Sequence, residues 1–150
     1  MTTWTEWNPA ILLLHTKITG KADFALVRQW ETSLRQAVDS IPDNAHFRVL
    51  ADLHGFEAAS FDVHKYFRTI IPETMAGCGW RVGYLGLFSE ADNLPLKNIR
   101  NLQCIAAAHV HHDESKINTY QERFGHSREQ FFTDPKKALQ WLITTDMAIK

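Results

Sequence analysis

Hydrophobic and polar positions follow a helical period most clearly over residues 22–41. The stripe consists of Phe24, Val27, Leu34, Val38 and Ile41, with either Trp30 or Glu31 at the position between Val27 and Leu34. Spacings of three and four place them on one side of a helix. The pattern predicts a helix over 22–41 that buries this stripe against a sheet. Asp23 lies in its first turn, where the helix dipole favours an acid, and Pro42 ends it.

Shorter apolar runs, bounded by glycine, proline or asparagine, predict strands. They cover residues 2–7, 10–19, 46–56, 102–110 and the stretch REQFFTD at 128–134. Asn8 and Pro9 form the turn between the first two runs, and Gly20 is expected to end the second. Residues 80–88 fit either a strand or irregular structure. Residues 89–101 have the composition of a surface loop with a short helical piece.

Capping residues predict where three further helices begin. Ser60 precedes a helix over 61–71, which Pro72 kinks or restarts. Asp113 or Ser115 caps a helix that runs to residue 124, with Gly125 just past its end. Asp134 and Pro135 are the N-cap and first residue of the last helix.

Strands and helices alternate along most of the chain, which is typical of an α/β layer. We predict a single domain over 1–150. Its centre is a mixed, mostly parallel sheet of about five strands, with an N-terminal hairpin and about four helices. A chain of 150 residues is about one domain and long enough to bury a core.

Composition narrows the classes of function. The formal net charge is −1, so no electrostatic attraction favours nucleic acid. No apolar run approaches the roughly 20 residues of a membrane helix, and the first residues do not resemble a signal peptide. Cys78 and Cys104 lack CxxC spacing and are expected to be reduced thiols. Together these features predict a cytoplasmic protein.

Four stretches resemble a known family. A hairpin ending in TKITGKAD, the strand RVLADLHGFE, an alanine-rich strand and FFTDPKKALQWL follow the order of the SpoIIAA-like group of STAS-type domains. The group is also described as akin to CRAL-TRIO lipid carriers. The resemblance implies a small α/β domain with helices mostly on one side of the sheet. It implies binding or signalling more than catalysis.

The sequence departs from that family at its phosphorylated serine. In the anti-sigma-factor antagonists of the group, the strand is followed by an Asp-Ser-Ser-Gly turn. Here the strand continues as DLHGFEAASFD, and Ser60 lies where the aspartate of that turn falls. We predict that Ser60 is a helix cap and is not phosphorylated.

The stretch AHVHHDES gathers most of the candidate chemistry. In a strand, residues two apart share a face at a distance of about 6.6 Å, so His109, His111 and Asp113 face one side and His112 the other. Two imidazoles and a carboxylate are a known ligand set for zinc or iron. The competing interpretation is a polar pocket at the end of a strand, with the Asp113 carboxylate used as a helix cap.

The favoured hypothesis is a non-enzymatic STAS-like binding or signalling module without a cofactor. It has a pocket for a small ligand or a protein partner near the carboxyl ends of the strands, and its candidate contacts are His54, His109, His111 and His112. One alternative is a metal-dependent enzyme that uses zinc or iron on His109, His111 and Asp113. Another is a carrier of a small apolar molecule or lipid. The sequence does not identify the protein partner or small molecule, and it leaves open whether the chain forms a homodimer.

Overall fold

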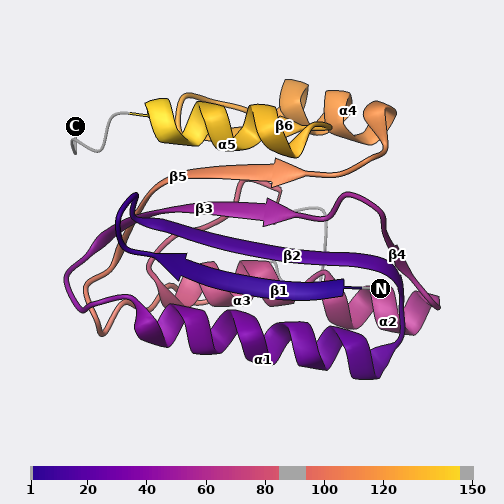
Figure 1. The fold of residues 1–150 in the computed structure, drawn as a ribbon, viewed down its shortest axis with the longest axis horizontal. Coiled ribbons are helices and arrows are strands. Elements are labelled where there is room, and N and C mark those ends of the chain that lie inside the picture. The colour runs from indigo at the N-terminus through magenta and orange to yellow at the C-terminus, as the bar shows by residue number, and fades with distance from the viewer. Residues whose placement is uncertain (1, 85–93, 146–150) are drawn as a thin grey trace.

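The computed structural model describes residues 2–84 and 94–145 and is built around one β-sheet (Figure 1). Its elements are β1 (Thr2–Asn8), β2 (Leu13–Ala22), α1 (Phe24–Ser40), β3 (His46–Asp52), β4 (Phe56–Ala58), α2 (Phe61–Phe67), α3 (Ile70–Gly77), β5 (Gln103–Val110), α4 (Glu114–Phe124), β6 (Glu129–Phe132) and α5 (Pro135–Thr144). The strand order is β1-β2-β3-β5-β6, with β4 paired to β2. The first pair is antiparallel, and the others are parallel. The predicted α/β class is confirmed.

The second strand differs from the prediction at both ends. Residues 10–12 form a turn, and β2 runs through Gly20 to Ala22. Leu13–Lys17 pair with β3, whereas Gly20–Ala22 pair with β4. Gly20 has a φ of 90°, a conformation that glycine adopts without strain, and its N–H donates to the Gly55 carbonyl oxygen at 2.9 Å. Gly20 therefore lets the strand change neighbours instead of ending it.

The two faces of the sheet are covered differently. The larger core packs α1, α2 and α3 against one face of β2 and β3, and Figure 1 shows these helices together below the sheet. On the other face, α5 packs against β3, β5 and β6. Ala106 and Ala108 of β5 lie under Ala138 and Leu142 of α5. These alanines are fully buried, and their small side chains let the helix approach closely.

The predicted stripe of α1 is buried along most of its length. Val27 and Leu34 are buried and Val38 is half-buried. Trp30, which shared its position in the pattern with Glu31, is fully buried and donates from Nε1 to Thr16 Oγ1 at 2.7 Å. The prediction is wrong for Phe24, which is 38% exposed. Phe24 is the first residue of α1 and packs only at the rim, 6.0 Å from the Tyr66 ring.

The helix predicted over 61–71 is two helices, and the break between them lies before Pro72, where a kink or restart was predicted. α2 ends at Phe67 and α3 begins at Ile70, so Pro72 lies inside the first turn of α3. A proline is tolerated there because the first N–H groups of a helix have no intrahelical acceptor. The capping predictions are confirmed: Ser60 Oγ accepts from the Val63 N–H, and Asp113 and Asp134 cap α4 and α5.

The segment between α3 and β5 is irregular where it is described. Residues 80–84 contain no strand and 94–101 no helix, while the rest of the segment, 85–93, lies outside the described residues. Within residues 2–84 and 94–145, no helix is long and apolar enough to cross a membrane.

Candidate functional site

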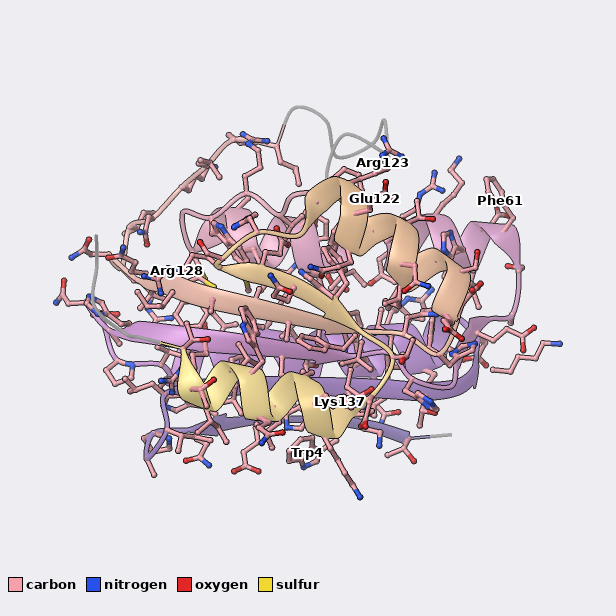
Figure 2. All side chains as sticks on the ribbon, turned by 90° about the horizontal axis from the view of Figure 1, so that it is seen from above. Trp4, Phe61, Glu122, Arg123, Arg128 and Lys137 are labelled. Atoms are coloured by element: carbon pink, nitrogen blue, oxygen red, sulfur yellow. The ribbon has the colours of Figure 1, made fainter. Side chains whose placement is uncertain are left out.

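A pocket opens at the carboxyl end of β5, between that strand and the helices α2, α3 and α4. Figure 1 and Figure 2 both place α2 and α4 at the same end of the sheet. The pocket is lined by Leu53, His64, Phe67, Arg68, Ile71, Tyr84, His109, Val110, His111, Lys116, Ile117, Tyr120 and Phe131. About 80 Å³ is open to the centres of water-sized molecules. On that measure a single water needs roughly 10–15 Å³, so the pocket has room for a small molecule.

His109 lies at the base of this pocket and is paired with a buried acid. It is the penultimate residue of β5 and is 8% exposed. Its Nε2 lies 2.7 Å from Oε2 of Glu129, which is the first residue of β6 and is 1% exposed. The His109 ring stacks on Phe131, with centroids 4.7 Å apart, and meets the edge of Tyr84 at 5.3 Å. The imidazole is therefore held from three sides.

The second carboxylate oxygen of Glu129 is also occupied. Oε1 accepts a hydrogen bond from the Gly83 backbone N–H at 3.0 Å and lies 3.6 Å from His126 Nε2. A buried carboxylate is costly unless such partners are present. Burial, followed by the charge of Glu129, raises the pKa of Tyr84, so this phenol stays protonated.

Sequence reasoning missed Glu129, although a signal was present. In the stretch REQFF, Glu129 and Phe131 are two residues apart and share one face of the strand, and both are buried. An acid on the apolar face of a short strand marks a buried carboxylate that needs a partner. The partner came from β5, whose His109 pairs with Phe131 in the parallel register.

The mouth of the pocket carries cationic and imidazole groups from two helices and a strand end. Lys116, in the first turn of α4, is half-buried, and burial lowers its pKa. Its Nζ lies 5.7 Å from the centroid of the Tyr120 ring and forms no ion pair with any residue in the described part of the chain. Arg68 caps the carboxyl end of α2 and also lines the pocket. Among the described residues that line the pocket there is no aspartate or glutamate.

The histidines that follow β5 are tied to the backbone. The Asp113 N–H donates to Nδ1 of His111, and the Gly55 N–H donates to Nδ1 of His112, both at 3.0 Å. The two rings stack with centroids 4.3 Å apart, contrary to the expectation that they point to opposite sides. The chain has left the strand at Val110, so strand alternation no longer applies. Burial, and then the positive charge of Lys116, lowers the pKa of His111 to about 4.

Of the four histidines predicted to contact a ligand, two line the pocket and two lie outside it. His109 and His111 line the pocket. His54 and His112 are exposed and lie beside each other outside it, with ring centroids 5.9 Å apart. The sequence did not indicate that α4 contributes Lys116 and Tyr120.

The alternative metal site is not assembled. Among residues 2–84 and 94–145, no group of three or more His, Cys, Asp or Glu side chains is placed to hold a metal ion. His109 is directed to Glu129, the Nδ1 atom of His111 accepts from the backbone, and the Asp113 carboxylate accepts from the Lys116 N–H at 3.1 Å. Each of the three proposed ligands has a different partner.

Comparison with known proteins does not relate the chain to any family. No protein-family model matches the chain, and neither the curated proteins nor the solved structures contain a significant match. The resemblance to SpoIIAA-like STAS-type domains stays a prediction.

Proposed function

We propose that this protein is a cytoplasmic, non-enzymatic binding module of the STAS type, whose pocket takes a small organic anion with an apolar or aromatic body. The observation that carries the proposal is the combination of an apolar wall with an ammonium group that has no acidic partner in the described chain. Phe67, Ile71 and Ile117 are buried and form part of that wall. Lys116 supplies the charge.

The energetics of Lys116 support an anionic ligand. Removing an ammonium group from water costs free energy unless an opposite charge or hydrogen bonds replace the lost solvation. Burial lowers the pKa of Lys116, and among the described residues the one charge that raises it is Asp113, whose carboxylate caps the same helix. The carboxylate of a ligand would supply a counter-charge that the described residues do not, while the apolar body of the ligand would cover the aromatic wall.

The test compares two probes of nearly the same shape. Phenylacetate carries the anion, and phenylacetamide replaces it with a neutral amide. We expect saturation-transfer NMR and calorimetry to detect phenylacetate binding, with phenylacetamide at least about tenfold weaker, as for the loss of one charge-assisted contact. Lys116→Met should weaken phenylacetate by a similar factor. Lys137→Met is the matched control, because Lys137 is an exposed lysine on α5, outside the pocket lining (Figure 2).

The outcomes separate the competing hypotheses. Equal binding of both probes, unaffected by Lys116→Met, would favour a carrier of neutral apolar molecules. Absence of binding by phenylacetate and by other small aromatic carboxylates would refute the anion pocket. Far-UV circular dichroism of each variant checks that the fold is retained.

A further inference from the structure

His109 has a second ring nitrogen, Nδ1, besides the Nε2 that is paired with Glu129. Nδ1 makes no hydrogen bond to any described residue. The His109 side chain is 10% exposed and lines the pocket. Since His109 lines the pocket and is otherwise enclosed by Glu129, Phe131 and Tyr84, its exposed part opens there.

Glu129 determines what this nitrogen offers. A carboxylate accepts hydrogen bonds, so the contact at 2.7 Å places the imidazole proton on Nε2 of His109. In a neutral imidazole the other nitrogen then carries a lone pair and accepts. The orientation is rigid, because Glu129 is itself held by the Gly83 N–H and the His109 ring is stacked on Phe131.

From this geometry we infer that the His109–Glu129 pair makes the base of the pocket a fixed hydrogen-bond acceptor, selecting anionic ligands that also carry a hydroxyl group. The inference rests on the proposed anion pocket and deepens it. The anion is held near Lys116 at the mouth, and the ligand hydroxyl donates to His109 Nδ1. A ligand with only an acceptor at that position leaves two lone pairs facing each other, and a site built for a hydroxyl discriminates strongly against such a ligand.

The same geometry predicts that one isosteric substitution, Glu129→Gln, changes His109 Nδ1 from a hydrogen-bond acceptor to a donor. In Glu129→Gln, the terminal oxygen must remain where Oε1 is, because the Gly83 N–H donates to that position. The amide NH₂ then occupies the position of Oε2 and donates to His109 Nε2. The imidazole proton has to move to Nδ1, which turns the acceptor at the base of the pocket into a donor.

The first experiment needs no ligand. Long-range ¹H–¹⁵N NMR at pH 7.5 reports which imidazole nitrogen is protonated, and a His109→Gln variant identifies the His109 signals by their loss. We expect the Nε2–H form in the natural chain and the Nδ1–H form in Glu129→Gln. A doubly protonated ring or an Nδ1–H form in the natural chain, or an unchanged tautomer in Glu129→Gln, would overturn the inference.

The second experiment measures selectivity with three probes: phenylacetate, 4-hydroxyphenylacetate and 4-methoxyphenylacetate. The natural chain should bind the hydroxyl probe about tenfold more tightly than the methoxy probe, and Glu129→Gln should remove or reverse this preference. If all three bind equally and depend on Lys116, the inference fails and the proposed function survives. If none binds, the proposed function fails as well, while the tautomer measurement still decides the state of His109. Thermal unfolding of each variant serves as the folding control.

Discussion

The two ends of the parallel strands both carry cationic or imidazole side chains, but they use them differently. At the amino end, the terminal nitrogens of two guanidinium groups donate to carbonyl oxygens of the chain itself, although Arg48 Nε has no partner among the described residues. Arg48 donates to the carbonyl oxygens of Ile11 and Thr145 at 2.6 and 3.1 Å. Arg100 donates to the Val38 carbonyl oxygen at 2.9 Å, to the Ile41 carbonyl oxygen, and to Asp43 at 2.7 Å.

At the carboxyl end, comparable groups are left facing a pocket. Lys116 forms no ion pair in the described chain, and Nδ1 of His109 makes no hydrogen bond there. Polar groups in folded proteins are nearly always satisfied by the protein or by something bound to it. At the amino end the arginines join segments of the chain to one another, whereas at the carboxyl end Lys116 and His109 Nδ1 have no such partner among the described residues. This difference is what the proposed binding pocket rests on.

Arg100→Ala should have the largest effect on stability and should break the amino end without touching the pocket. Its guanidinium group joins the end of α1 to the segment before β5, and its loss leaves the Val38 and Ile41 carbonyl oxygens without this donor. We expect the free energy of unfolding to fall by about 2 kcal/mol, measured by urea denaturation. Phenylacetate affinity should stay unchanged.

Arg35→Ala is the control for that result. Arg35 pairs with Glu31 one turn away on α1 and lies 3.7 Å from Glu73 of α3, and its side chain is 51% exposed. An exposed pair of this kind contributes about 0.5 kcal/mol or less. Equal losses for the two arginine variants would show that the bonds of Arg100 to the backbone carry no special weight.

Ser60→Ala should have an intermediate effect, because Ser60 is a satisfied polar group at the pocket end. Its hydroxyl accepts from the Val63 N–H at 3.2 Å and caps α2. Loss of the cap should cost about 1 kcal/mol, and Ser60→Asp should be nearly neutral because aspartate also caps. Phosphate on Ser60, found by mass spectrometry of protein from its native host, would contradict a purely structural role.

Acid should produce the smallest of the three effects, and it acts through His111. The pKa of His111 falls from 6.5 to about 4 on folding. Above pH 6.5 both folded and unfolded states are neutral at this residue, so its contribution is complete. As pH falls from 6.5 toward 4, the unfolded state binds the proton first, and stability declines. Because His111 is only half-buried, we expect a loss on the order of 1 kcal/mol or less.

His111→Asn separates this effect from other titrating groups. Asparagine retains an acceptor for the Asp113 N–H but does not titrate. His15, whose pKa is also lowered by burial, is present in both proteins, so its contribution cancels in the comparison. An identical decline in stability between pH 6.5 and 4 in both proteins would exclude His111 as the source.

Local signals determined much of the fold. The apolar stripe of α1, the caps at Ser60, Asp113 and Asp134, and the alternation of strands and helices were readable in the sequence, and the structure confirms them. Each depends on interactions within a few residues, such as a carboxylate accepting from an N–H three positions away. The sequence alone therefore predicted the class, most of the element order and the end of the sheet at which the imidazoles gather. The prediction of one strand over 46–56 is wrong, because β3 ends at Asp52 and Phe56–Ala58 form β4, which pairs with β2.

Tertiary structure decided the contacts that give those groups their chemistry. His109 and Glu129 are twenty positions apart and meet only because β5 and β6 are paired in one register. His111 and Lys116 share a pocket because α4 returns along the end of the sheet. Gly20 shows that the same holds for the fold. The strand continues past Gly20 because Gly20–Ala22 pair with β4, and that pairing could not be predicted from the local sequence. Periodicity reports which face a residue occupies, whereas the partner on that face depends on the pairing of distant strands and on helix packing.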